Sequence, residues 1–126
     1  MRVQDLLAAV RLMRGNYRAV YAVGLEGGAL VPLHAAAIDN SISGVATVRT
    51  LISYQDILER PLYAEPLSSI VPCARAYYDL AELARMISPR PSVAVEPHDA
   101  LRRPIKAALS DEAVVREILS GLHLRR

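Results

Sequence analysis

The 126-residue chain contains no tryptophan and no phenylalanine, so aliphatic side chains have to form its core. Hydrophobic residues nevertheless make up 52% of the sequence, which is enough to fill the interior of one small domain. We therefore expect residues 1–126 to fold as a single domain with a core of leucine, valine, isoleucine and alanine.

The chain has one cysteine, Cys73, which excludes an intramolecular disulfide and a cysteine metal cluster. Cys73 follows Pro72 in a mostly apolar segment, and we expect a buried, unreactive thiol. The three histidines, His34, His98 and His123, lie far apart in the sequence. Because the sequence offers no closely spaced set of ligands, we predict no metal site and no cofactor.

Lysine is nearly absent, with Lys106 the only one, and the formal net charge is only +2. The arginines are scattered rather than clustered, so we expect no nucleic-acid partner. The sequence also lacks an apolar run of about 20 residues and the pattern of a secretory signal peptide. The expectation is a soluble protein, cytoplasmic by default, without a membrane partner.

Short β-branched runs alternate with segments whose apolar residues recur at helical spacing. This alternation predicts an α/β fold with a small parallel sheet of about three strands in a three-layer arrangement. The expected strands are 19–23, 44–51 and 92–96. The expected helices are 3–13, 29–38 and 79–87, the last with a capping box, and a helical pattern from 99 onward with a fresh start at 111–119. Prolines limit 54–72 to short helices and turns.

The stretch "RAVYAVGLEGG" is typical of a buried strand that enters a helix through a sharp turn. Glu26 stands at the tip, in a strained conformation, and we expect Gly24 and Gly28 to remove side chains that would clash with the turn. The glycine spacing matches neither a dinucleotide fingerprint nor a P-loop. Three roles remain open for Glu26: a structural turn carboxylate, a remnant with a binding role, or a working nucleophile or base.

Three blocks, "YRAVYAVGLEGGALVPLHAAAID", "SGVATVRTLISY" and "YDLAELARMISPRPSVAVEPHDALRRPI", together resemble the C-terminal half of an α/β-hydrolase. The resemblance covers roughly residues 3–107 and is greatest to acetyl-xylan-esterase-like and dienelactone-hydrolase-like members. It implies a truncated hydrolase sandwich. It places Glu26 at the nucleophile position, Gly27 as a backbone donor of the oxyanion hole, Asp99 as the acid and His123 as the histidine.

Several residues also have simpler interpretations. Asp99 follows Pro97–His98 and is expected to be a helix N-cap. We expect His98 to be a solvent-exposed loop residue and His34 to pack or to reach a backbone group. Tyr54 and Tyr63 either line a carbohydrate-like cleft or pack at the surface.

Serine is absent from the nucleophile position, so the resemblance implies a degenerate hydrolase of the carbohydrate or acyl esterase lineage. Such a pseudoenzyme would lack ordinary esterase turnover but could retain a small ester or carbohydrate ligand. The alternative is a non-catalytic interaction or assembly module.

The missing half of the sheet bears on this choice, because it leaves strand 19–23 as an open apolar edge. We expect a second copy, another chain that supplies the missing half, or the first helix to cover this edge. The leading expectation is a homodimer that continues the sheet across a two-fold axis.

Overall fold

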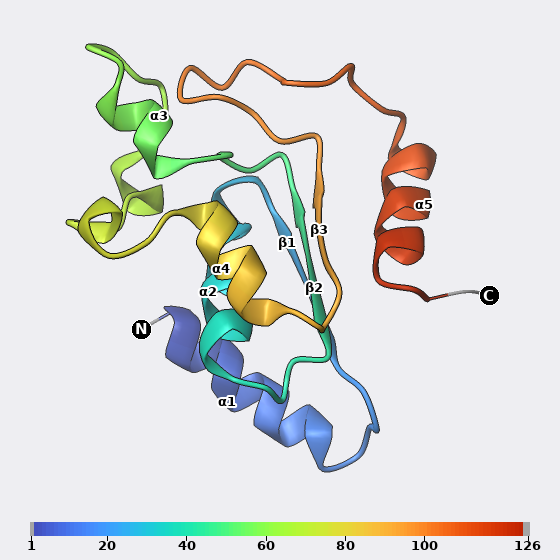
Figure 1. The fold of residues 1–126 in the computed structure, drawn as a ribbon. Coiled ribbons are helices and arrows are strands. Elements are labelled where there is room, and N and C mark those ends of the chain that lie inside the picture. The colour runs from blue at the N-terminus through green and yellow to red at the C-terminus, as the bar shows by residue number, and fades with distance from the viewer. Residues whose placement is uncertain (1, 125–126) are drawn as a thin grey trace.

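The computed structural model describes residues 2–124 and shows a three-stranded parallel sheet between helices (Figure 1). The strands β1 (Tyr21–Leu25), β2 (Gly44–Val48) and β3 (Ser92–Val95) lie in the order β1-β2-β3. Both neighbouring pairs are parallel. The predicted α/β class, the parallel pairing and the number of strands are confirmed.

Helices and short 3-10 turns connect the strands. The helices are α1 (Arg2–Arg14), α2 (Leu30–Ile38), α3 (Tyr54–Leu58), α4 (Leu80–Ile87) and α5 (Asp111–Gly121), and the 3-10 turns are η1 (Glu26–Gly28), η2 (Leu67–Ser69) and η3 (Ala74–Ala76). Within residues 2–124, none of these helices has the length and apolar character needed to cross a bilayer.

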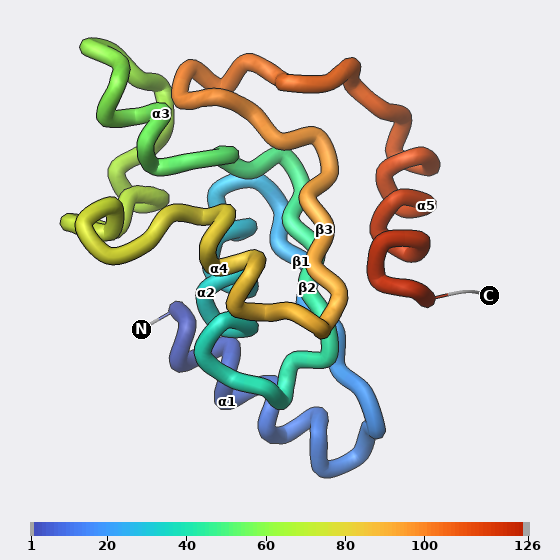
Figure 2. Tube along the Cα trace, viewed as in Figure 1, coloured from blue at the N-terminus to red at the C-terminus, as the bar shows by residue number. Residues whose placement is uncertain are grey.

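The helices cover the two faces of the sheet unequally (Figure 2). On one face α2 packs against β1 and β2, and α1 and α4 pack against α2. On the other face α5 packs against β3 and β2. The larger core cluster lies with α2, whereas a smaller one joins Val48 and Val95 of the sheet to Val114 of α5.

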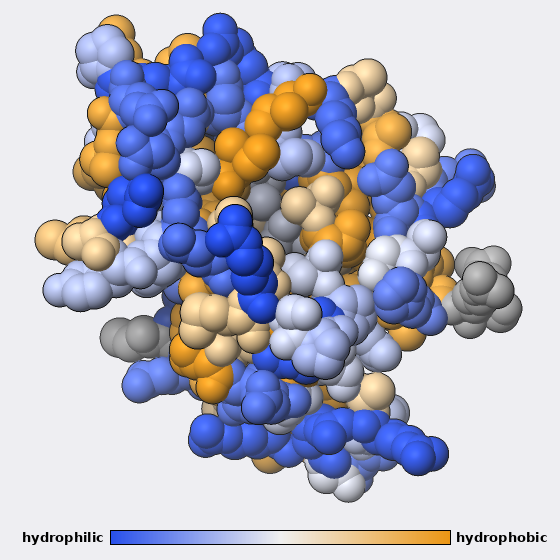
Figure 3. Space-filling view, viewed as in Figure 1, coloured by the Kyte–Doolittle hydropathy of each residue, from blue (hydrophilic) through white to orange (hydrophobic). Residues whose placement is uncertain are grey.

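Strand β1 is therefore buried on one face only. Ala22 is 7% exposed under α2, but Val23 is 49% and Leu25 62% exposed on the opposite face. The prediction of a first strand buried on both faces was wrong, because α5 does not extend over β1. In the space-filling view, apolar side chains reach the surface in patches, including beside α5 (Figure 3).

The sharp turn after β1 forms as predicted, with Glu26 at φ 47° in the left-handed region. A Cβ on Gly24 would lie 2.5 Å from the Ala29 Cα and 2.6 Å from the Pro32 Cγ, so the chain can enter α2 there only with glycine. A Cβ on Gly28 would meet nothing within 4 Å. The expectation that Gly28 relieves a clash was wrong, because its Cα faces open space.

Helix α4 begins with the predicted capping box, in which Asp79 caps the first turn and the Glu82 side chain accepts from the Asp79 backbone. The Asp79 carboxylate also accepts hydrogen bonds from Ser53 and from the backbone of Tyr54 and Gln55. Burial alone would raise the pKa of Asp79, but these bonds outweigh it and hold the pKa below its ordinary value. One carboxylate thus joins the starts of α3 and α4.

Two local predictions were wrong. Residues 99–110 form turns rather than a helix, so Asp99 is not the expected helix N-cap; it closes a tight loop, and Pro104 interrupts the chain before α5. Cys73 is exposed rather than buried, since it sits in a left-handed bend at φ 60° that turns it outward.

We predict that Gly24→Ala destabilises the fold by about 1–3 kcal/mol, because the added methyl group would overlap the backbone at the start of α2. Gly28→Ala is the matched control and is expected to be neutral or slightly stabilising, since nothing lies near its Cβ. Chemical denaturation monitored by circular dichroism measures both. Equal effects of the two substitutions would contradict this packing of the turn.

Candidate functional site

Three charged residues stand in a row where the strands end. The last paired residues are Leu25, Val48 and Val95, in register with one another. The next residue in each strand is Glu26, Arg49 or Glu96, and all three adopt left-handed backbone, with φ of 47°, 53° and 49°. Each strand therefore turns away from the sheet at the same level and leaves a charged side chain at its carboxyl end.

Arg49 and Glu96 form the tightest ion pair of this row. The Arg49 Nε donates to the Glu96 Oε2 at 2.8 Å, and the backbone N–H of Leu109 donates to the Glu96 Oε1 at 2.6 Å. The Glu96 side chain is 5% exposed and that of Arg49 46%. The Leu109 amide, and next the Arg49 guanidinium, hold the pKa of Glu96 below its ordinary value. The pair fixes the chain leading into α5 against the end of β2.

Glu26 remains free beside this pair. Its side chain is exposed and makes no ion pair or hydrogen bond with any residue between 2 and 124. Asp111, at the start of α5, lies 4.0 Å from the Arg49 guanidinium. The row thus holds one arginine between two glutamates, with Asp111 of α5 nearby, and Glu26 is the carboxylate that makes no ion pair with the described residues.

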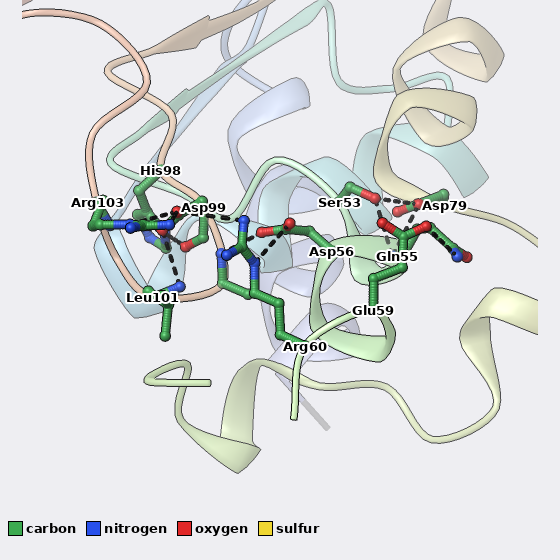
Figure 4. Close-up of polar contacts among 11 residues, drawn as sticks. Ser53, Gln55, Asp56, Glu59, Arg60, Asp79, His98, Asp99, Leu101 and Arg103 are labelled. Carbon is green, nitrogen blue, oxygen red and sulfur yellow. Dashed lines mark hydrogen bonds and ion pairs between the residues drawn. The ribbon is translucent and has the colours of Figure 1, made fainter. Parts of the chain in front are cut away.

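Asp99 is occupied by its own loop (Figure 4). Its Oδ1 accepts from the backbone of Leu101 at 2.9 Å and of Arg103 at 2.8 Å. Its Oδ2 accepts from the Arg103 guanidinium at 2.8 Å and lies 3.7 Å from that of Arg60. Burial alone would raise the pKa of Asp99, yet the bonds from Arg103 and Leu101 bring it below its ordinary value. No histidine ring nitrogen in residues 2–124 bonds to this carboxylate, whose role as an acid stays a prediction.

His98 is buried, with 7% of its surface exposed, so the expectation of a solvent-exposed loop residue was wrong. The reason is that strand-like pairing continues past β2 and β3: the His98 N–H donates to the Thr50 carbonyl at 2.9 Å, and His98 bridges to Leu51. Its ring Nδ1 lies 2.9 Å from the Asp99 carbonyl, and its Nε2 lies 3.8 Å from the buried carboxylate of Glu65.

The other residues of the expected site are spread over the fold. Gly27 follows Glu26 in η1 and is exposed. His123 follows α5, whose Gly121 packs on Val93 near the start of β3. Since α5 begins beside Arg49 and runs back along the sheet, His123 lies at the opposite end from Glu26 (Figure 1).

Contacts confirm the simpler interpretation of His34, whereas the choice between a cleft and surface packing for the two tyrosines stays open. His34 lies 2.7 Å from the Leu30 carbonyl and 3.0 Å from the Tyr78 hydroxyl, as expected of a histidine that reaches a backbone group. Tyr54 is 4% exposed and packs in the core, whereas Tyr63 is 42% exposed. Among residues 2–124, no three His, Cys, Asp or Glu side chains group in a way that could hold a metal ion.

Sequence reasoning missed Arg49 and Glu96. A signal was present, since each residue follows directly on a short β-branched run, and carboxyl ends of parallel strands meet at one edge of a sheet. The pairing of the two side chains depends on strand register, which the local sequence does not specify.

Comparison of the chain with models of known protein families, with curated proteins and with solved structures found no match.

We predict that Glu96→Gln makes the fold less sensitive to acid. In the wild type the Glu96 carboxylate binds a proton less tightly in the folded chain than in the unfolded chain. The ionised carboxylate therefore stabilises the fold fully above its ordinary pKa of 4.5. This stabilisation is lost as pH falls through the lower folded pKa. Glutamine keeps an acceptor for Leu109 but cannot titrate. Urea denaturation across the acid range measures the effect.

The control is Glu112→Gln, which removes an exposed carboxylate on α5. This change is expected to leave the acid dependence of the free energy of unfolding as in the wild type. An unchanged acid dependence in Glu96→Gln would show that the Arg49–Glu96 pair does not contribute to stability.

Proposed function

We propose that this chain is an α/β-hydrolase-like half-fold, without ordinary esterase turnover, that works as an assembly module. Its sheet is extended along β1 by a second copy of the same chain. The observation that carries the proposal is the open edge of β1, with Val23 and Leu25 exposed beside it. Among residues 2–124, β1 has a strand partner on one side only, which is β2.

An uncovered strand of this kind is a template for pairing with another chain. Soluble proteins usually protect such an edge with charges, proline or a bulge, but β1 carries the apolar sequence YAVGL. Helix α1 does not close the edge, because an apolar groove lined by Val10, Met13, Val20 and Ala22 separates it from the strand. Both faces beside the edge are therefore apolar, which favours a protein strand as occupant.

The arrangement at the strand ends supports the absence of ordinary turnover. An acyl-enzyme mechanism needs a nucleophile, a base within hydrogen-bond reach and a group that orients the base. Glu26 has an arginine rather than a histidine as its neighbour in the row, and the Asp99 carboxylate is held by Arg103 and its loop. A carboxylate at the turn then acts through its charge rather than as an acylated nucleophile.

We predict that the wild type does not hydrolyse a chromogenic acetyl ester faster than Glu26→Gln does. The reason is that no base is placed to assist Glu26. The two proteins are compared at equal concentration, with the uncatalysed rate subtracted. Turnover by the wild type that disappears in Glu26→Gln would overturn this half of the proposal and make Glu26 a working residue.

Sedimentation velocity tests the assembly part of the proposal. Over protein concentrations of about 1–100 μM, which are on the order of common protein dissociation constants, the average mass should rise with concentration. Val23→Pro is expected to weaken this association at least about tenfold, because proline removes a backbone donor from the edge. Val23→Ala keeps the donor and is the matched control. Circular dichroism checks that both variants fold.

A wild type that stays monomeric at every concentration would refute assembly through a second copy. Association that Val23→Pro leaves intact would place the interface elsewhere.

A further inference from the structure

The direction in which the N–H and C=O groups of β1 point determines which of them can bond to a partner strand. The Val20 carbonyl accepts from the Ser43 N–H at 2.7 Å, so it faces β2. Backbone groups alternate along a strand, and Ala22 and Gly24 therefore also face β2. The residues that turn their N–H and C=O groups to the open side are Tyr21, Val23 and Leu25.

Two charged residues of opposite sign flank this edge. Arg18 precedes β1 and Glu26 follows it, and both are exposed. Neither side chain forms an ion pair or a side-chain hydrogen bond with the part of the chain that the structure covers, residues 2–124; Arg18 contributes only its carbonyl, which accepts from Arg14. The edge thus has one free positive end and one free negative end.

An edge of this kind complements itself when two copies run antiparallel, because the start of one strand then meets the end of the other. Ala22 lies midway between Arg18 and Glu26 in the sequence. A two-fold axis through the paired Ala22 residues therefore brings the segment before β1 of each copy, with Arg18, toward the turn after β1 of the other, with Glu26. Shifting the axis to Val23 would set Arg18 opposite Gly28 and leave both charges unpaired.

We infer that the second copy, on which the proposed assembly function rests, adds antiparallel along β1 with Ala22 on the two-fold axis and reciprocal Arg18–Glu26 pairs. Tyr21 then faces Val23 of the other copy, and both present outward backbone groups, so the two residues exchange both hydrogen bonds. The central Ala22 pair is of the non-hydrogen-bonded type, in which Cα atoms approach to about 4.5 Å and small side chains fit best.

The side chains on the exposed face agree with this register. Leu25, which is 62% exposed, comes opposite Ala19 of the other copy, and Val23 comes opposite Tyr21. Every opposed pair on this face is apolar, so cross-strand contacts cover surface that the single chain leaves in water. The two sheets become one continuous sheet, and the two-fold contact uses the same edge of both copies, which closes the assembly as a dimer.

The test reverses the two charges separately. Arg18→Glu gives a chain with two negative ends and Glu26→Arg a chain with two positive ends. Arginine is tolerated at position 26, because Arg49 and Arg102 already adopt left-handed backbone in this fold. Each variant alone is expected to dimerise at least about tenfold more weakly than the wild type, since two attractive pairs become repulsive.

An equimolar mixture of the two variants should regain dimerisation close to that of the wild type, because a heterodimer restores both opposite-charge pairs. Sedimentation equilibrium at low salt measures the dissociation constants of the wild type, of each variant alone and of the mixture. Arg116→Glu, on the exposed side of α5, makes the same change in net charge as Arg18→Glu and should dimerise like the wild type.

Two results would overturn the inference, and only the second would also refute the proposed assembly function. If the single variants dimerise like the wild type, or the mixture is no tighter than its parts, the register is wrong while assembly through β1 stands. If the wild type itself shows no self-association, the proposed assembly function fails with it.

Discussion

The backbone of β1 has hydrogen-bonding groups on two sides, and the described chain satisfies those on only one. Strand β2 pairs with both of its neighbours, whereas β3 is the other edge strand and has α5 packed against one of its faces. Strand β1 keeps a free row of N–H and C=O groups with apolar surface on either side of it. The fold can bury its core without this edge, since α2 and β2 hold the inner face of β1, so the edge is available to the second copy that we propose.

The carboxyl ends of the strands are governed by a second constraint, which is electrostatic. All three strands leave the sheet through a left-handed residue that carries a charge. Arg49 lies between two glutamates and hydrogen-bonds to Glu96, so Glu26 feels the charge of Arg49 but forms no ion pair with it. The same local geometry that resembles a catalytic turn thus provides a fixed, exposed carboxylate at the end of the open edge. In the assembly that we propose, a feature that looks catalytic in the sequence has a positional role.

Away from this row, two carboxylates hold loops together through several hydrogen bonds each. Asp79 joins α3 to α4, and Asp99 closes the loop after β3 with Arg103 (Figure 4). Both carry pKa values below the ordinary range, because several donors converge on them. These low values follow from structural bonds, so they are not evidence of catalysis.

Local patterns in the sequence predicted what depends on neighbouring residues. The spacing of apolar residues gave α1 and α2, and Asp79 with Glu82 gave the start of α4. The patterns could not predict features set by long-range contacts. His98 is buried because pairing continues beyond the ends of the strands, Arg49 finds Glu96 through strand register, and Val23 is exposed because α5 covers only part of the sheet. Gly28 shows the same limit, since whether a glycine relieves a clash depends on what packs against it.

Hydrogen exchange at the amides of β1 tests the central claim most directly. If a second copy covers the edge, the amides of Tyr21, Val23 and Leu25 will exchange more slowly as protein concentration rises, whereas those of Ala22 and Gly24, already bonded to β2, will be slow throughout. Outward amides that exchange quickly at every concentration, in protein whose inward amides are protected, would contradict the account.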